Sequence, residues 1–251
     1  MQPINIKVEE DINKMKEGGR RLGLVKNKLK EAIRPGVSAM EIENLAVKLI
    51  ESQRARPSFK MVAGYRWATC ININDGLVHG IPKQETIFKK GDVVSVDVGA
   101  FYEGFHTDTS FSVEIEGSPD VKKFLGAGEA ALEAAIESAQ PGRRIYDISA
   151  AIETSLLKAK VTPIRALVGH GVGRALHEEP AIPCFTTGRK EDSPKIVPGM
   201  VLAIEVMYAR GGKDIVRDSD GWTIRMADGK ISALFEETVA VTLHDPLVLT
   251  N

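Results

Sequence analysis

The sequence contains an internal repeat, and this repeat limits the folds open to the chain more than any other feature. A Pro-Gly dipeptide at 35–36 recurs at 141–142, and in each place it separates two helical stretches. Proline cannot continue a helix and pushes the preceding residue out of the helical region, so one helix should end before each dipeptide. Downstream, segments 91–98 and 199–206 match each other and are rich in the β-branched residues that favour strands.

The repeat predicts two pseudo-equivalent halves, at about residues 10–120 and 121–245, each with two helices and a pair of strands. The second strand of each half should begin with an acidic residue, Asp108 or Glu236. We expect one curved, antiparallel-rich sheet with helices on its outer face, an α+β architecture. No linker divides the halves, so residues 1–251 should form a single domain. Chance matches are the alternative, but two ordered matches at nearly equal offsets favour duplication.

Composition excludes several classes of protein. The chain carries 33 basic and 34 acidic residues, which argues against binding nucleic acid by bulk electrostatics. Two cysteines without a CxxC motif indicate a reducing compartment. The N-terminus lacks the apolar region of a signal peptide, and no apolar run approaches the roughly 20 residues of a membrane helix. These features predict a cytoplasmic protein.

Carboxylates interrupt the two repeated strands at equivalent places. Asp97 and Glu205 each lie between branched aliphatic residues, six positions after a glycine. An ionised carboxylate in an apolar environment must be paired, protonated or bound to metal. An outward-facing position would explain one such residue, but two equivalent positions favour convergence on a pseudo-twofold axis. Asp108 and Glu236 would converge there too, and divalent cations are the natural species to neutralise four carboxylates.

A histidine among glycines adds a further candidate ligand. His170 lies in a segment with three glycines, at 169, 171 and 173, and His177 follows seven residues later. A lone histidine is usually structural, but four candidate carboxylates favour a ligand role for His170. Four carboxylates and one imidazole favour Mn, Fe, Co or Zn, whereas a structural zinc site would use cysteines. The HExxH, P-loop and GxSxG motifs are absent, which weakens zincin, nucleotide-binding and serine-hydrolase interpretations.

Six motifs across residues 10–245 resemble those of the type I methionine aminopeptidases of the M24 metallopeptidases. They are LVHGIP, VDVGAFYEGFHTDTS, GHGVGRALHEEP, PGMVLAIEVM, DGWT and ALFEETVAVT. The resemblance implies the duplicated pita-bread fold and two divalent metal ions. It also implies removal of the initiator methionine from nascent proteins, with a preference for a small second residue.

The same resemblance assigns roles to individual residues. The implied metal ligands are Asp97, Asp108, His170, Glu205 and Glu236. Glu205 would also act as general base and then general acid on the attacking water. His177 would hydrogen-bond the scissile carbonyl and steady the oxyanion, and His79 would contact the scissile amide. Catalytic roles would thus fall to His79, His177 and Glu205.

The resemblance also implies a small apolar pocket for the methionine side chain. Its expected walls are Tyr65, Cys70 and Trp222, and Leu176 stands where many family members have an aromatic residue. Ordinary core packing is the alternative for each wall residue. The chain departs from the family pattern in one segment and at three single positions: 60–67, Val78, Thr107 and Val206. No departure removes a ligand, so we expect them to affect rate and side-chain preference more than metal binding.

Two other functions remain open on the sequence. An Xaa-Pro aminopeptidase or dipeptidase would share the fold and the ligands, but usually carries a long extra N-terminal domain. A non-catalytic pita-bread binding module would typically have lost ligands, and this chain has all five. The expected partners are nascent polypeptide N-termini, and the expected state is a monomer without membrane or specific nucleic-acid contact. A transient ribosome contact through the basic clusters at 26–30 and 89–90 is an additional hypothesis.

Overall fold

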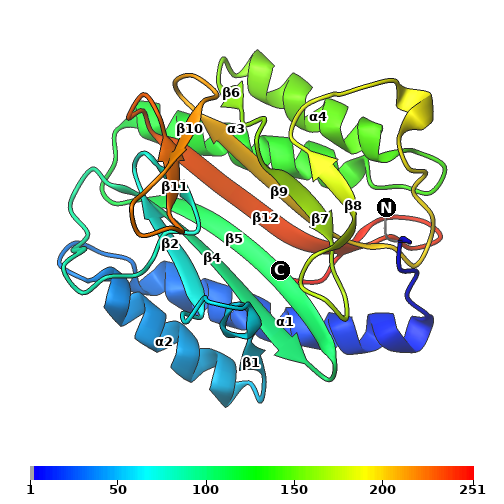
Figure 1. Cartoon of the computed structure of the whole chain (residues 1–251), viewed down its shortest axis with the longest axis horizontal. Helices are drawn as coiled ribbons and strands as arrows, with labels where there is room; N and C mark the ends of the chain where they lie inside the picture. The colour runs from blue at the N-terminus through cyan, green and yellow to red at the C-terminus, as the bar shows by residue number, and fades with distance from the viewer. Residues whose placement is uncertain (1–2) are drawn as a thin grey trace.

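The computed structural model describes residues 3–251, which form a sheet with helices on its outer side (Figure 1). Four α-helices are present in this part of the chain: α1 (Glu9–Ala32), α2 (Ala39–Ser52), α3 (Pro119–Glu137) and α4 (Ile145–Lys158). Short 3-10 turns lie at η1 (Phe59–Met61) and η2 (Lys190–Asp192). None of the helices in residues 3–251 combines the length and apolar character needed to cross a membrane.

A large, mainly antiparallel sheet runs through the molecule in the order β1-β4-β5-β12-β9-β7-β8. Its strands are β1 (Arg56–Pro57), β4 (Val93–Tyr102), β5 (Phe105–Glu114), β12 (Ser232–Ala240), β9 (Val201–Ala209), β7 (Val168–Gly171) and β8 (Glu178–Pro183). Three further strands attach to it: β2 (Thr69–Ile73) to β4, β6 (Thr162–Pro163) to β9 and β13 (Leu247–Val248) to β12. A separate ribbon contains β3 (Gly76–Val78), β11 (Ile224–Met226) and β10 (Ile215–Arg217).

The duplication predicted from the repeat is visible in the backbone. The glycines of the two Pro-Gly turns, Gly36 and Gly142, have φ angles of +86° and +85°. The glycines that precede the matched strands β4 and β9, Gly91 and Gly199, have φ angles of +89° and +90°. Such angles belong to the left-handed region, which glycine enters without a steric penalty. Each glycine therefore adopts the same left-handed backbone conformation as its counterpart in the other half.

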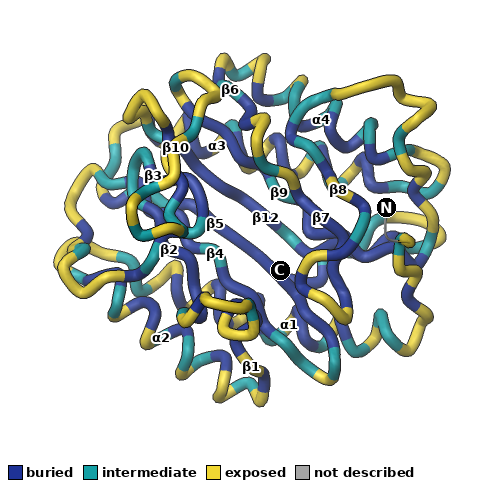
Figure 2. The backbone as a smooth tube through the Cα atoms, in the orientation of Figure 1, coloured by how far each residue is buried: buried dark blue, intermediate teal, exposed yellow. Residues whose placement is uncertain are grey.

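The two halves meet at the centre of the sheet, where β5 pairs with β12 through Ser110 and Glu236. Helices α1 and α2 pack on the strands of the first half, and α3 and α4 pack on those of the second (Figure 1). The strands themselves are largely buried, whereas the loops and the outer helix surfaces are exposed (Figure 2). The predicted α+β architecture, with a curved sheet and outer helices, is confirmed.

The helix boundaries follow local signals in the sequence. Helix α2 begins with a capping box, in which the Ser38 hydroxyl accepts from the Glu41 amide and the Glu41 carboxylate accepts from the Ser38 amide. Helix α3 has Ser118 as its N-cap and a proline directly after it, a position where a missing N–H does no harm. Helices α1 and α3 both end a few residues before the Pro-Gly turns, as the sequence predicts.

The prediction that Asp108 and Glu236 start their strands is wrong. Both lie inside, because β5 already begins at Phe105 and β12 at Ser232. The early start of β5 has a local cause. Glu103 and Gly104 have φ angles of +45° and +90°, and positive φ at both turn residues is typical of a tight hairpin turn between long strands.

Candidate metal centre and substrate pocket

A single row of paired residues crosses the four central strands. Asp97 pairs with Ser110, Ser110 with Glu236, and Glu236 with Glu205. Residues that face one another across antiparallel strands project from the same side of a sheet. The register therefore places three carboxylates on one face, with the hydroxyl of Ser110 between them.

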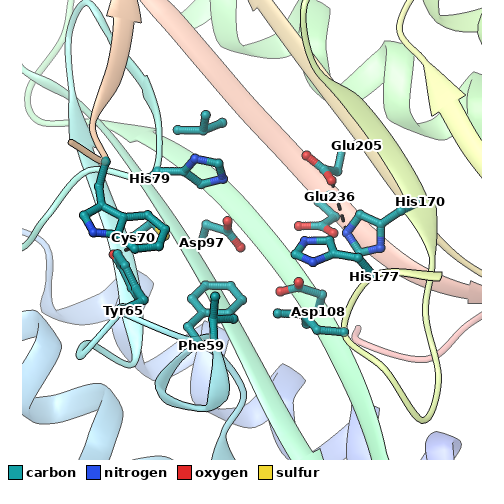
Figure 3. Close-up of a pocket in the computed structure, with 14 residues that line it drawn as sticks. Phe59, Tyr65, Cys70, His79, Asp97, Asp108, His170, His177, Glu205 and Glu236 are labelled. Atoms are coloured by element: carbon teal, nitrogen blue, oxygen red, sulfur yellow. Dashed lines mark hydrogen bonds and ion pairs between the residues drawn. The ribbon is translucent and has the colours of Figure 1, made fainter. Parts of the chain in front are cut away.

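Two further side chains join this row because side chains along a strand alternate between faces. Asp108 lies two residues before Ser110, and His170 pairs with Ala203, two residues before Glu205. Ligand atoms of Asp108, His170 and Glu236 all lie within 4.8 Å of one another. His170 Nε2 is 3.4 Å from Glu205 Oε1 (Figure 3). Three of the five predicted donors therefore meet closely, Glu205 contacts one of them, and Asp97 lies in the same row.

The electrostatics of this group are unfavourable without a counter-charge. Burial raises the pKa of the Asp97 carboxyl to about 7. Burial, followed by the charges of neighbouring carboxylates, raises the pKa of Asp108, Glu205 and Glu236 well above their ordinary values. Asp97 Oδ1 and Glu236 Oε1 are buried and have no hydrogen-bond partner among residues 3–251. Buried acceptors of this kind need protons or cations.

His170 is neutral and turns one ring nitrogen towards the carboxylates. Burial lowers its pKa to about 4, so the imidazole is uncharged at neutral pH. Its Nδ1 lies 2.8 Å from the Gly171 carbonyl oxygen, which can only accept, so Nδ1 carries the proton. The lone pair of Nε2 then faces the carboxylates, as in histidines that bind metals.

The glycines around His170 are required by close backbone packing. A Cβ on Gly169 would lie 2.6 Å from the Ala203 carbonyl oxygen, and a Cβ on Gly171 would collide with the backbone of Glu179. Strand β7 can therefore lie tightly between β9 and β8 only with glycine at these positions. The neutral imidazole and the oxygen-rich group beside it fit a divalent cation of borderline or hard character.

Two more histidines lie beside the carboxylates. The rings of His170 and His177 meet edge to face, with 4.5 Å between their centroids. His79 lies on the other side, with Asp97 between it and the His170–His177 pair (Figure 3). Burial lowers the pKa of His177 and of His79, so both are neutral at neutral pH and can each donate one N–H.

One cavity of about 170 Å³ has this group at its floor. All of the site residues predicted from the sequence line it: Tyr65, Cys70, His79, Asp97, Asp108, His170, Leu176, His177, Glu205, Trp222 and Glu236. Such a volume suits one amino-acid residue. A site that combines converging donors with an enclosed apolar end has the form of a ligand pocket.

The sequence profile of metallopeptidase family M24 matches residues 13–243, which is most of the chain. The chain belongs to this family. It is 39% identical to a methionine aminopeptidase of Aquifex aeolicus, with 99% of each chain covered. It is 40% identical to methionine aminopeptidase 1 of Bacillus subtilis, with 94% of each chain covered.

Solved structures agree with this assignment to family M24. A methionine aminopeptidase from Thermotoga maritima superposes with a TM-score of 0.96 at 37% identity, covering 99% of this chain and all of that one. A prolidase from Pyrococcus furiosus has a TM-score of 0.77 at 22% identity, and the match covers 65% of its length. The prolidase likeness shows a shared fold only.

The apolar end of the pocket in this M24 protein is built around Tyr65. Its ring packs edge to face on Trp222, with 5.0 Å between the centroids. Its hydroxyl donates to the Thr69 carbonyl oxygen at 2.9 Å and lies 3.3 Å from Cys70 Sγ. These contacts give the Tyr65 hydroxyl its partners and leave the aromatic faces apolar.

Sequence reasoning missed the wall residue Phe59, and treated Val62, within segment 60–67, and Val78 only as departures from the family pattern. Phe59 and Val62 come from the η1 turn and the loop after it. Their sequence carries no periodic pattern, so nothing in it indicates which side chains face the pocket. Their positions depend on contacts such as the edge-to-face packing of Phe59 on Tyr65, at 6.5 Å.

Proposed function

We propose that this chain is a metal-dependent aminopeptidase that removes the N-terminal methionine from polypeptides. The observation that carries the proposal is the cavity itself. Carboxylate and imidazole groups suited to bind metal lie at one end, and an aromatic wall lies at the other. The full-length likeness to methionine aminopeptidases supports the same substrate.

The metal ions would be held by all five predicted ligands: Asp97, Asp108, His170, Glu205 and Glu236. Divalent cations bound there would lower the pKa of a water molecule and polarise the substrate carbonyl. We propose two ions, because four carboxylates and one imidazole offer more donor atoms than a single small cation needs. Mn, Fe, Co and Zn are all compatible with this ligand set.

The protein side chains would manage the protons of the reaction. Glu205 would accept a proton from the attacking water and pass it to the leaving amine. His177 would donate its N–H to the scissile carbonyl oxygen as negative charge develops there. His79, across the cavity, would contact the scissile amide.

The methionine side chain would occupy the apolar end of the cavity. Tyr65 and Trp222 give flat aromatic faces, and Cys70 and Leu176 close the end with small and aliphatic surface. Sulfur–aromatic contacts would add to simple apolar burial there. We also expect a preference for a small second residue, which peptides that differ at that position can test.

The decisive experiment is hydrolysis of a peptide panel with metal removal and add-back. We expect cleavage of Met-Ala-Ser and Met-Gly-Ser, loss of activity in chelator, and recovery with one or more of Mn, Co, Fe and Zn. Activity on Ala-Pro peptides alone would support an Xaa-Pro aminopeptidase instead. Metal-loaded protein that cleaves none of the peptides would support a binding module.

We propose that the natural substrates are nascent chains in the cytoplasm and that the protein acts as a monomer. The two free, buried cysteines fit a reducing compartment. Size-exclusion chromatography with light scattering tests the monomer, since a mass near 54 kDa instead of 27.3 kDa would indicate a dimer. Co-sedimentation with ribosomes tests the proposed transient contact.

A further inference from the structure

The backbone of His79 has an unusual conformation for a residue with a side chain. Its φ angle is +58°, in the left-handed region that residues other than glycine rarely enter. His79 directly follows strand β3 and projects its ring into the cavity (Figure 3). Residues hold such angles only where the surrounding structure imposes them, and they concentrate at functional sites. The contacts that impose this angle therefore matter for the placement of the ring.

The strongest of these contacts come from strand β2. The Gly80 amide donates to Asn72 Oδ1 at 3.0 Å, and the Gly80 carbonyl oxygen accepts from the Ile71 amide at 2.8 Å. A Cβ on Gly80 would lie 2.6 Å from Asn72 Oδ1 and would also collide with the Ile71 carbonyl oxygen. Glycine is thus needed after His79 so that the chain can approach β2 closely enough for both hydrogen bonds to form.

Asn72 is well suited to fix this loop. The residue is 2% exposed and lies on β2, which is paired with β4, the strand that carries the proposed ligand Asp97. Its Nδ2 is buried without a hydrogen-bond partner among residues 3–251. A buried donor without a partner destabilises a fold, so an apolar residue would serve packing better at this position. The amide side chain is explained by its oxygen, which is the acceptor for Gly80.

The other side of the loop is held more weakly. The Ile81 amide lies 3.4 Å from Thr223 Oγ1, and that hydroxyl donates to Asp220 Oδ2 at 2.7 Å. Asp220 also accepts from the amide of Trp222, a wall residue of the pocket. The long distance at Ile81 makes this a secondary contact, and the Asn72 bond is the main one.

We propose that Asn72 is a positioning residue for His79, which it orients by holding Gly80 and so fixing the left-handed turn. This inference rests on the proposed function, because it needs His79 to contact the substrate. Asn72 does not line the cavity and acts only through the loop. It should therefore affect turnover more than affinity for the methionine side chain, which binds at the aromatic end.

The test compares Asn72→Leu, which removes the acceptor at similar volume, with Asn72→Asp, which keeps an oxygen at the same place. We expect Asn72→Leu to lower kcat on Met-Ala-Ser by roughly tenfold to a hundredfold, with KM and bound metal nearly unchanged. Asn72→Asp should recover most of the rate. Ser95→Ala is the matched control, since Ser95 pairs with Asn72 across β2 and β4 but bonds to Ser112.

A double-mutant cycle separates positioning from a general loss of structure. In the His79→Ala background, Asn72→Leu should cause no further loss of kcat, because the residue that Asn72 orients is absent. If Asn72→Leu lowers kcat by the same factor in both backgrounds, the proposal is overturned. A wild-type kcat in Asn72→Leu would overturn it too. If Asn72→Leu does not fold, Asn72→Ala removes the same acceptor without introducing bulk and takes its place in the cycle.

Amide hydrogen exchange gives a readout that does not depend on activity. The Gly80 amide should be protected in the wild type and in Asn72→Asp, and should lose protection in Asn72→Leu. Unchanged protection in Asn72→Leu would overturn the inference. Wild-type protein without activity on any methionyl peptide would refute the proposed function instead, while the exchange result would still decide whether Asn72 holds the turn.

Discussion

The four carboxylates at the floor of the cavity are unfavourable to ionise when no cation is bound. Burial raises the pKa of all four, and the charges of neighbouring carboxylates raise it further for Asp108, Glu205 and Glu236. His177 and His79 lie beside them but are neutral and carry their own donors. Ligands and proton-handling residues should therefore respond differently to substitution.

Asp97→Ala should lose bound metal and activity together, whereas His177→Ala should keep the metal and lose rate. Removal of one oxyanion donor typically lowers kcat by about 10² to 10³. Metal content by atomic spectroscopy and kcat on Met-Ala-Ser provide the check. Normal activity in either variant would contradict the assigned roles.

Substitution in the aromatic wall should change KM, whereas substitution of His177 should change kcat. Trp222→Ala removes the ring that packs on Tyr65 and should raise KM for methionyl peptides about tenfold, with a smaller change in kcat. The reason is that the side-chain pocket binds ground state and transition state alike. A fall in kcat with unchanged KM would indicate that Trp222 acts on the reacting groups instead.

At the level of elements, an ion pair joins the N-terminal segment to the loop that carries His177. Lys7 Nζ lies 2.6 Å from Glu178 Oε2, and the two side chains are only 5% and 4% exposed. Glu178 Oε1 also accepts from the Ala175 amide at 3.1 Å, and the Lys7 amide donates to the Gly199 carbonyl oxygen at 2.8 Å. The extended segment before α1 is thus tied to both β8 and the turn before β9.

Lys7→Met should lower the free energy of unfolding by about 3–5 kcal/mol, because it leaves the buried Glu178 carboxylate without a cation and with neutral hydrogen-bond donors alone. The double variant Lys7→Met/Glu178→Gln should lose much less. Burial alone would raise the pKa of Glu178, but the bonds from Lys7 and the Ala175 amide hold it below its ordinary value. The pair therefore stabilises the fold above the unfolded-state pKa of 4.5, and this contribution is lost as pH falls through the folded-state pKa.

Chemical denaturation at neutral and at acid pH measures both effects. The difference between wild type and Lys7→Met should shrink in acid. A difference that stays constant with pH would show that lost packing, and not the charge pair, destabilises the variant.

At the level of the whole molecule, metal binding should be coupled to stability, because the proposed ligands come from both halves of the sheet. Asp97 and Asp108 belong to the first half, and His170, Glu205 and Glu236 to the second. Cations at this place would neutralise carboxylates that otherwise repel one another across the β5–β12 junction.

Metal-free protein should therefore become less stable as pH rises from about 4 towards 7. In that range these carboxyls lose their protons in the unfolded chain. They keep them in the folded protein, because the pKa of Asp97 is raised to about 7 and the pKa values of the other three are raised well above their ordinary values. The folded state therefore binds more protons, and its stability falls as pH rises. Metal at a hundred times its dissociation constant should add about 2.7 kcal/mol. Thermal unfolding with chelator and with metal, across pH, measures this, and equal Tm values with and without metal would contradict it.

Much of this protein could be predicted from its sequence because the relevant signals are local or repeated. The Pro-Gly turns and the glycines before matched strands predict the duplicated architecture, and carboxylates inside apolar strands indicate a shared polar centre. These signals depend on backbone preferences and on the high free energy of a buried charge, and both apply whatever the tertiary fold.

The tertiary structure alone decided which residues pair across the strands and which contacts hold the site residues in place. The row through Asp97, Ser110, Glu236 and Glu205 depends on how whole strands pair, and a shift by one residue would turn every side chain to the other face. The left-handed turn at His79, the Asn72 bond that holds it and the Lys7–Glu178 pair are likewise absent from any local pattern. Such contacts join segments that are distant in sequence or depend on backbone approach, so only the assembled fold determines which groups meet.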